Sequence, residues 1–228
     1  MEFNQTVMAR RSLRAYEEGK TVEKAQIEEL IRFAQMAPSW KNSQTGRYYV
    51  VMSPEMLEKV RKDCLPEFNQ KNSANAPALI ITAFEKTRSG FTREGVAENE
   101  VGEGWGCYDL GLQNENLVLK AKDMGLDTLI MGIRNSEKLR EYLEIPASQE
   151  VVSVIAVGYG AIKPEMPVRK NVEDIVKGLG TSIDYAVFAN KFTQQTHMEG
   201  NIAVKDAYIS QIFNFTSAVI KVNRSNTY

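Results

Sequence analysis

Apolar residues recur at two different spacings along the chain, and the alternation between them predicts helices interleaved with strands. Runs of β-branched, aromatic or continuously apolar residues predict strands at 48–52, 78–84, 127–133 and 151–158. The run at 78–84 is nearly continuously apolar, which is typical of a strand covered on both faces. The pattern therefore predicts a sheet sandwiched between helices.

Helical spacing of apolar residues predicts the helices between these strands. Residues 27–34 carry a first amphipathic stripe, with Thr21 as the N-cap. Pro38 is expected to end this helix, because the residue before a proline is pushed out of the helical region. Ser53 and Pro54 begin the next helix, with a serine cap and a proline at its first position.

The longest predicted helix spans residues 105–124 and has little polar surface. A helix that is apolar on two sides is typical of a protein core or of a subunit interface. Its two stripes contain Cys107, Leu110, Gly111, Leu117, Val118, Ala121 and Met124 on one side and Tyr108, Leu112 and Leu119 on the other. A shorter helix is predicted to run to Leu143, with Ser136 as its N-cap.

Two segments differ from this alternation. Residues 86–104 contain charges and four glycines with little periodicity, and a loop of this length predicts a mobile lid that controls access of a substrate. Beyond residue 178 charge becomes sparse, and a helical stripe is predicted from Tyr208 to Ile220. We therefore expect one domain at 1–177, followed by a C-terminal extension at 178–228.

Charge and cysteine content narrow the classes of partner. With 228 residues, a net charge of −1 and a pI of about 6.0, the chain has no overall field that would attract nucleic acid or an anionic membrane. No apolar run approaches the roughly 20 residues of a membrane span, and the polar start is no signal peptide. We therefore expect a cytoplasmic protein in which Cys64 and Cys107 are reduced thiols.

A single histidine, His197, limits the chemistry that side chains can supply. It argues against a nucleophile activated by histidine and against a multi-histidine metal site, so no metal is expected. If the protein is an enzyme, a cofactor is expected to carry the chemistry.

A dense group of positive charges lies near the start of the chain, at Arg10, Arg11 and Arg14, with Ser12 between them. Guanidinium groups bind phosphate in a bidentate manner and keep their charge, so this group is a candidate site for a phosphorylated cofactor. On composition alone, a solvated basic turn is the alternative. A second cationic pair lies far along the chain, at 169–170.

The order of the motifs is more specific than any one of them. In sequence they are Arg10-Arg11-Ser12-x-Arg14, Ala37-Pro38-Ser39-x-x-Asn42-Ser43-Gln44, Asn75-Ala76-Pro77, Asp109-x-Gly111 with Asn116, Met124-Gly125-Leu126 leading to Met131-Gly132, and Val157-Gly158-Tyr159 followed by Arg169-Lys170. As an ordered set, these motifs resemble the FMN-dependent nitroreductase family over about residues 5 to 177.

The resemblance implies an α+β fold with a mostly antiparallel sheet flanked by helices, and a homodimer with FMN at the subunit interface. Positions that match contacts to the FMN phosphate and ribityl chain are Arg10, Arg11, Ser12, Arg169 and Lys170. Arg14 matches the cation beside the pyrimidine edge of the flavin. A fixed positive charge there stabilises the negative charge of reduced flavin.

Other matched positions surround the rest of the flavin. Those that reach it from the partner subunit are Pro38, Ser39 and Asn42, with Gln44 close by. The backbone of Met131, Gly132 and Ile133 matches the segment that faces flavin N5. Asn69 or Lys71 matches a contact to the pyrimidine edge, although the sequence does not fix the register between these two.

The chain departs from the family pattern beside these positions. Thr45-Gly46 replaces a frequent Pro-Trp pair, and Trp40 fills a position that is commonly small. Both departures change the pocket expected over the flavin. Many relatives also end near the position of Lys177, so the extension is expected to be an arm that wraps the partner subunit or a poorly ordered tail.

The activity implied by the resemblance is ping-pong transfer of hydride from NADH or NADPH, through flavin N5, to a nitroaromatic, a quinone or a similar acceptor. It requires no side chain as acid or base. Two alternatives remain open at this point. One is a flavoprotein of the same fold with another reaction, such as reductive dehalogenation or flavin destruction. The other is a non-enzymatic flavin-binding redox sensor that uses Cys64 or Cys107.

Overall fold

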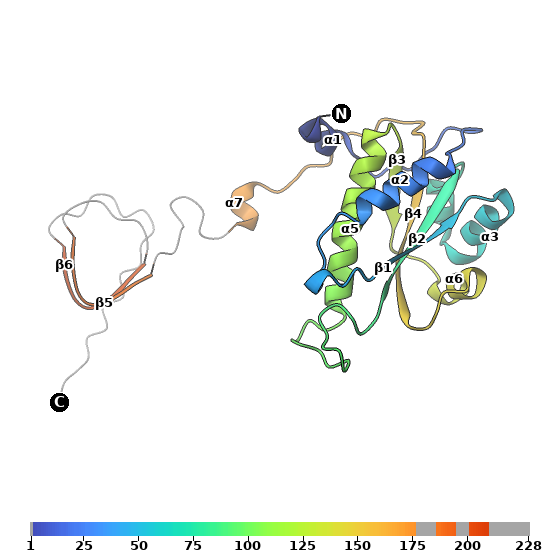
Figure 1. Ribbon diagram of the computed structural model, residues 1–228. Coiled ribbons are helices and arrows are strands. Elements are labelled where there is room, and N and C mark those ends of the chain that lie inside the picture. Colours follow the sequence, from blue (N-terminus) through green and yellow to red (C-terminus); the bar gives the residue numbers. More distant parts are fainter. Residues whose placement is uncertain (1, 177–185, 195–200, 210–228) are drawn as a thin grey trace. The chain divides into compact units, whose positions relative to one another are not determined.

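The computed structural model describes residues 2–176, 186–194 and 201–209 (Figure 1). Its internal contacts divide the chain into two units, one ending at Met166 and the other beginning at Pro167. No helix in the described part of the chain is long and apolar enough to cross a membrane.

The first unit is built on a four-stranded sheet in which every neighbouring pair is antiparallel. The strands are β1 (Gly46–Val51), β2 (Ala78–Glu85), β3 (Asp127–Met131) and β4 (Gln149–Gly158), and their order across the sheet is β1-β2-β4-β3. The central strands β2 and β4 are the most apolar in sequence and the most buried. The predicted α+β class with an antiparallel sheet is confirmed.

Helices cover both faces of this sheet (Figure 1). α2 (Lys24–Ala34) and α5 (Gly104–Asp123) lie over one face, and α3 (Pro54–Cys64) and α6 (Ser136–Leu143) lie over the other. Side chains of a strand alternate between faces, so Ile80 joins the core under α2 and α5 while its neighbours in β2 join the opposite core. The predicted sandwich of a sheet between helices is confirmed.

Three short helices complete the first unit. They are α1 (Phe3–Ala9), the 3-10 helix η1 (Trp40–Asn42) and α4 (Glu67–Asn72). Each lies directly beside a segment for which the sequence predicts a site residue. α1 precedes the arginine segment, η1 contains Trp40 and Asn42, and α4 contains both Asn69 and Lys71.

A β-bulge interrupts the pairing of β2 with β4. Thr82 pairs with Ser153 whereas Ala83 pairs with Val151, so β4 holds one extra residue at this point. For this reason Val151 and Val154, three positions apart, both enter the core under α3 and α6. The apolar run alone gives no sign of this shift, because every position in it is compatible with a buried strand.

The predicted helix boundaries are mostly correct, but two of the predicted caps are wrong. α2 begins after Glu23, two residues beyond Thr21, and the Glu23 backbone N–H donates to Gln26 Oε1 at 2.9 Å. The cap of α6 is Asn135, whose Oδ1 accepts the Lys138 N–H at 3.0 Å, so Ser136 is the first helical residue. In α2 the pairing of Glu23 with Gln26 replaces the expected Thr21 cap, and in α6 the longer side chain of Asn135, one residue before Ser136, accepts the bond.

The long helix α5 is confirmed, but the predicted phase of its buried stripe is wrong in its first half. Cys107 and Gly111 are exposed, and Tyr108 is 60% exposed. Leu110 is buried as predicted, but three polar residues beside it also face the protein interior, namely Asp109, Gln113 and Asn114. Hydrophobic periodicity could not find this face, because polar side chains occupy it.

The second unit contains α7 (Val172–Ile175) and a parallel pair of strands, β5 (Ala186–Gln194) and β6 (Asn201–Ile209). Tyr208 and Ile209 therefore end a strand, and the helix predicted to begin there is wrong at these two residues. The apolar residues Ile202, Val204 and Tyr208 lie at even spacings, a strand pattern that overrides the helical one. The remainder of that prediction, residues 210–220, lies outside the described residues.

Candidate functional site

The arginine segment lies along β3, which is an edge strand of the sheet. Arg10 is the C-cap residue of α1, and its N–H donates to Thr6 O at 2.9 Å. Ser12 then forms a parallel bridge with Thr128 of β3, and the Leu13 N–H donates to Thr128 O at 2.9 Å. Backbone hydrogen bonds to the sheet therefore fix the position of this segment.

Leu13 and Tyr16 anchor the segment in the core. They are 1% and 4% exposed, and the Tyr16 hydroxyl donates to Ala156 O at 3.2 Å. Tyr16 also forms an antiparallel bridge with Gly160. With these two side chains directed inward, Ser12 and Arg14 are exposed to solvent beside the sheet.

The positive charges of this segment are not neutralised within the described part of the chain. Arg11 donates through Nη1 to the carbonyl of Arg10, and Arg14 donates through Nη1 to Ser12 O at 3.2 Å. Neither these two arginines nor Arg10 pairs with a carboxylate in the described part of the chain, and Arg11 Nε is buried without a partner. Uncompensated guanidinium groups with spare donors favour a bound anion.

The segment that follows β3 is the second part of the site. Met131 is buried, whereas Ile133 is 65% exposed. Apart from Gly132 and its two chain neighbours, no residue has a heavy atom within 4 Å of the position that a Cβ on Gly132 would take, so a flat ligand could approach this backbone closely. Thr128 and Met131 are about 10 Å apart along the strand, because a strand rises about 3.3 Å per residue.

Two side chains fix the carbonyl groups of this segment. Arg134 donates through Nη1 to Gly132 O at 3.0 Å, and its Nη2 donates to Val151 O in β4. Asn69 is 6% exposed, and its Nδ2 donates to Ile133 O at 3.1 Å. Asn69 therefore lies beside the predicted N5 segment, and its contact with the pyrimidine edge of a flavin stays a prediction.

Lys71, the other candidate on α4, lies on an exposed part of the helix. Its Nζ lies 2.7 Å from Glu67 Oε1, and the two side chains are 74% and 80% exposed. An ion pair this exposed contributes little stability, so Lys71 is available to a ligand. Its role as a flavin contact stays a prediction.

The loop between α2 and β1 has an unusual backbone conformation. Lys41, Asn42 and Gln44 have φ values of 46°, 56° and 49°, the left-handed region that residues other than glycine rarely adopt. Such conformations cost about 1 kcal/mol or more each and are found mainly where surrounding structure requires them. Ser39 Oγ accepts the Gln44 N–H at 3.1 Å and so closes the loop. Pro38 lies on its exposed rim.

Asp109 holds this loop to the rest of the unit. The side chain is 2% exposed, and Oδ2 accepts the Trp40 N–H at 3.0 Å and the Ser89 hydroxyl at 2.6 Å. One buried carboxylate on α5 therefore joins the 38–44 loop to the 86–104 segment. Asp109 belongs to one of the sequence motifs but has no role predicted from sequence, although an acidic residue between apolar stripes is a sign of one.

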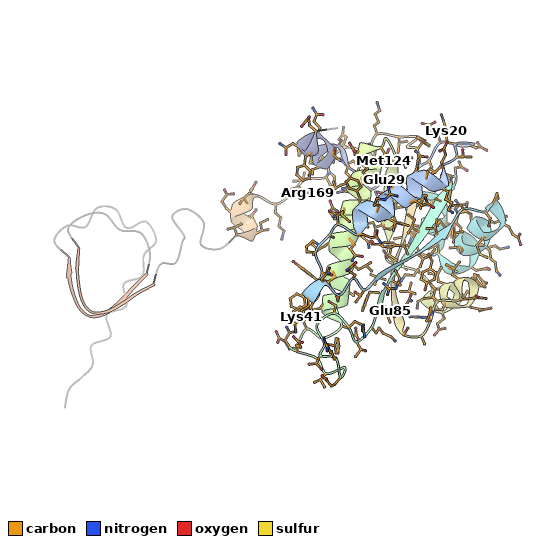
Figure 2. The ribbon with its side chains drawn as sticks, in the orientation of Figure 1. Lys20, Glu29, Lys41, Glu85, Met124 and Arg169 are labelled. Atoms are coloured by element: carbon orange, nitrogen blue, oxygen red, sulfur yellow. The ribbon has the colours of Figure 1, made fainter. Side chains whose placement is uncertain are left out.

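Two further contacts fasten the 86–104 segment to the same loop. Lys41 Nζ lies 2.6 Å from Glu98 Oε1, and Figure 2 shows Lys41 beside the segment that precedes α5. The rings of Trp40 and Trp105 meet at a centroid distance of 4.6 Å. The predicted absence of regular structure in 86–104 is confirmed apart from one isolated bridge and Gly104, the first residue of α5, whereas its motion as a lid stays a prediction.

Arg169 and Lys170 belong to the second unit, where both are exposed. The arginine segment belongs to the first unit. Their place in a phosphate site with Arg10 and Arg11 stays a prediction, as does the approach of Pro38, Ser39 and Asn42 to a flavin in a partner subunit.

Comparison with known proteins identifies the family. The sequence profile of the Nitroreductase family matches residues 7–159, which is more than half of the chain. The chain therefore belongs to the nitroreductase family, whose members are oxidoreductases, and the resemblance noted in the sequence is confirmed.

Curated relatives agree with this assignment. A protein of Archaeoglobus fulgidus named "Putative NADH dehydrogenase/NAD(P)H nitroreductase" is 29% identical over 162 residues, which cover 67% of this chain and 82% of the relative. The Bacillus subtilis protein "Putative NAD(P)H nitroreductase YdgI" is 24% identical over 188 residues, covering 70% and 89%.

Solved structures show the same fold. A nitroreductase family protein from Streptococcus pneumoniae superposes with a TM-score of 0.66 at 24% identity, covering 77% of this chain and 99% of that one. A protein from Exiguobacterium sibiricum, described as a "putative nitroreductase in complex with FMN", superposes with a TM-score of 0.67 at 21% identity, covering 78% and 97%.

Proposed function

We propose that the protein binds FMN and uses it to pass hydride from NADH or NADPH to nitroaromatics, quinones or similar acceptors by a ping-pong mechanism. One observation carries the proposal. Three arginines without carboxylate partners in the described chain lie beside the start of β3, and open backbone at Gly132 follows its end. The Exiguobacterium sibiricum structure contains FMN, and the two curated relatives are named for NAD(P)H nitroreductase activity.

The donor set of the arginine segment fits the phosphate of FMN. Arg10, Arg11 and Ser12 would hold the phosphate and ribityl chain, because guanidinium and hydroxyl donors bind phosphate oxygens well. Arg169 and Lys170 would complete the phosphate site. The buried Arg11 Nε, which has no partner within the described residues, is a donor that this ligand could satisfy.

Other residues would position the flavin ring. Arg14 would place a fixed positive charge beside the pyrimidine edge, with Asn69 or Lys71 close by. Arg134 and Asn69 hold the carbonyls of the strand-end segment in place, so the backbone of Met131 to Ile133 would face flavin N5 without reorganising.

Assembly as a homodimer would complete the site. Pro38, Ser39, Asn42 and Gln44 form an exposed loop and would reach the flavin of a second copy. The exposed start of α5, which carries Tyr108 and Gly111, offers apolar surface for that contact. Residues 1–177 would then form the FMN-binding domain and 178–228 an extension that wraps the partner.

The chemistry would belong to the cofactor, while the chain would supply binding and positioning. When bound, FMN can accept a hydride from a reduced nicotinamide and deliver it to an electrophile. The arginine segment would bind the negatively charged FMN, and the backbone at the end of β3 would orient the reactive edge of the flavin. The 38–44 loop and the 86–104 segment would shield that edge from water, because Asp109 joins them to α5.

The cysteines favour this proposal over a redox sensor. Burial raises the pKa of Cys64 to about 11, and burial is also the main cause that raises the pKa of Cys107. A redox-sensing cysteine needs a low pKa so that thiolate is present near pH 7. Reductive dehalogenation and flavin destruction are the alternative reactions for a flavoprotein of this fold. Identifying the substrate that is consumed would separate them from the proposed activity.

Steady-state turnover tests the proposal. Without oxygen, purified protein loaded with FMN should turn over NADH or NADPH only when a nitroaromatic or quinone is present, and double-reciprocal plots at several acceptor concentrations should be parallel. A matched control is free FMN at the same concentration. Turnover no faster than this control with every acceptor would contradict the proposed activity, and intersecting plots would contradict the ping-pong order.

A further inference from the structure

A cleft of about 420 Å³ lies beside the 38–44 loop, on the side of the 86–104 segment. It is lined by Ser43, Arg88, Phe91, Thr92 and Arg93. Ser43 stands between Asn42 and Gln44, which are both proposed to contact the flavin. The cleft therefore borders the place where a substrate would enter.

Two positive charges of this cleft have no partner. Arg88 and Arg93 are exposed, and neither guanidinium makes a hydrogen bond or an ion pair with any described residue. Two acids of the same segment are engaged elsewhere, because Glu98 pairs with Lys41 and Glu103 accepts the Thr87 N–H at 2.9 Å, and the exposed Glu100 does not line the cleft.

A third acid, Glu94, follows Arg93 directly in sequence. A hydrogen bond from the Thr92 hydroxyl is the main cause that lowers the pKa of this exposed carboxyl group. The cleft itself is lined by two arginines and by no acid, so its lining is positively charged.

The remaining lining residues add an apolar wall and a buried donor. Phe91 is half-buried and presents an aromatic ring. Ser43 Oγ is buried and has no hydrogen-bond partner in the described structure, which leaves a polar atom whose desolvation is uncompensated. An aromatic ligand that carries an anionic group would satisfy the charges, the ring and the hydroxyl together.

The cleft is held in shape before any ligand binds. Ser89 donates to the buried Asp109, and Gly90 lies so close to Trp105 that a Cβ there would come within 2.5 Å of the indole Cδ1. Lys41 and Glu98 fasten the opposite side. A preformed site loses less conformational entropy on binding, so two guanidinium contacts there would contribute more to affinity than on a free loop.

We propose that this cleft binds the anionic group of an aromatic or quinonoid electron acceptor, with Arg88 and Arg93 contacting a carboxylate or phosphate and Phe91 contacting the ring. The inference rests on the proposed function, since it names the class of acceptor that the flavin would serve. The same chemistry could come from the 2′-phosphate of NADPH, and the experiment below separates the two sources.

The test compares two acceptors that differ only in charge. 4-Nitrobenzoate and 4-nitrobenzamide carry the same ring and nitro group, but only the first is anionic. In the FMN-loaded protein, changing Arg88→Met and Arg93→Met together should raise KM for 4-nitrobenzoate about tenfold or more, the scale of one charged hydrogen bond. KM for 4-nitrobenzamide, which lacks the carboxylate, should change less than about twofold. The control variant Arg32→Met removes an exposed arginine from α2, where it pairs with Glu29 at 2.8 Å, and should change neither.

Each other outcome overturns the proposal. Equal loss for both acceptors would make the two arginines structural, and no change for either would mean that the cleft binds no anionic acceptor. If the double variant lost activity with NADPH but not with NADH, and KM for both acceptors stayed unchanged, the cleft would be assigned to the 2′-phosphate of NADPH.

A binding measurement keeps this inference separate from the proposed function. Calorimetric titration of the oxidised FMN-loaded protein with 4-nitrobenzoate requires no turnover. Binding that the double variant loses and Arg32→Met keeps would support the cleft even if no acceptor were reduced, whereas absence of binding in the wild-type protein would overturn it. If the wild-type protein binds 4-nitrobenzoate but reduces neither acceptor, the proposed function fails and the anion site stands.

Discussion

The arginine segment at residues 10–16 and the loop at residues 38–44 are both proposed to contact the flavin, but the protein holds them in different ways. The first is bonded through its backbone to β3 and to the chain beyond β4, and it buries Leu13 and Tyr16. The second has three residues other than glycine in the left-handed region, and the side chains of Asp109 and Glu98 fasten it.

The difference shows two ways to place a binding segment beside a sheet. Backbone bonds and apolar anchors tolerate many substitutions, so the arginines on the first segment are free to serve a ligand. A loop held by a few polar side chains depends on each of them, because a buried donor left without its acceptor costs about 1–3 kcal/mol. The 38–44 loop should therefore be the more sensitive of the two to single substitutions.

The largest effect is expected from Asp109→Ala, which removes the carboxylate that holds the 38–44 loop to α5. The change leaves the Trp40 N–H and the buried Ser89 hydroxyl without their acceptor, and each charge-assisted bond contributes about 1.5–3 kcal/mol. We expect the free energy of unfolding to fall by about 3 kcal/mol in urea denaturation. Glu115→Ala, which changes an exposed residue of the same helix, is the control. Its free energy of unfolding should stay within about 0.5 kcal/mol of wild type. Similar values for the two variants would show that Asp109 does not hold the loop.

Arg10→Ala tests the arginine segment. In contrast to Asp109→Ala, it should weaken ligand binding and leave the stability of the fold unchanged. Removing one charge-assisted contact should weaken FMN binding by about 1.5–3 kcal/mol. Fluorescence titration of the FMN-free protein measures the change, and Lys20→Ala, which removes another exposed cation near the same segment, is the control. Unchanged FMN affinity in Arg10→Ala would contradict the phosphate assignment.

Alkaline pH should loosen the anchor of the first segment. Burial is the main cause that raises the pKa of Tyr16 well above its usual value of 10, and Asp127 adds to it. Above pH 10 the unfolded chain releases this proton while the folded protein keeps it, so stability is present below pH 10 and falls as pH rises. For this group the slope approaches about 1.4 kcal/mol per pH unit.

Urea denaturation between pH 8 and pH 11.5 measures this slope, and Tyr16→Phe provides the comparison. The variant loses the hydrogen bond to Ala156 O, about 1 kcal/mol, at every pH, but its stability should fall less steeply above pH 10. Parallel curves for the two proteins would show that Tyr16 titrates normally.

The smallest effect is expected from Lys41→Ala. This lysine pairs with Glu98 at 2.6 Å but its side chain is 66% exposed, and exposed ion pairs contribute about 0.2–1 kcal/mol. We expect a loss of about 0.5 kcal/mol in urea denaturation, smaller still at high salt. A loss as large as that of Asp109→Ala would mean that the ion pair, and not the buried carboxylate, fixes the loop.

Much of the fold could be predicted from sequence because it depends on local patterns. The apolar runs of β2 and β4, the Ser53-Pro54 start of α3 and the length of α5 are each signalled by neighbouring residues. The register shift at Val151 could not be predicted in this way, because it depends on pairing between two strands. The cap of α2 at Glu23 was missed because Thr21 offers a more usual capping side chain.

The site was less accessible to sequence reasoning. The arginines are signalled by their charge density, and Asn69 came only from the family resemblance. The role of Asp109 depends on contacts with Trp40 and Ser89, which lie 69 and 20 residues away in sequence. No local pattern contains such contacts, and the apolar stripe predicted for α5 directed attention to Cys107 and Gly111 instead.

The arginine segment and the open strand end are proposed to hold a flavin that a nicotinamide reduces. Visible absorbance of the purified protein, recorded without oxygen before and after addition of NADPH and then of NADH, tests this proposal most directly. We expect a yellow protein whose flavin bands bleach with at least one of the two donors. A colourless protein that also fails to bind added FMN would contradict it.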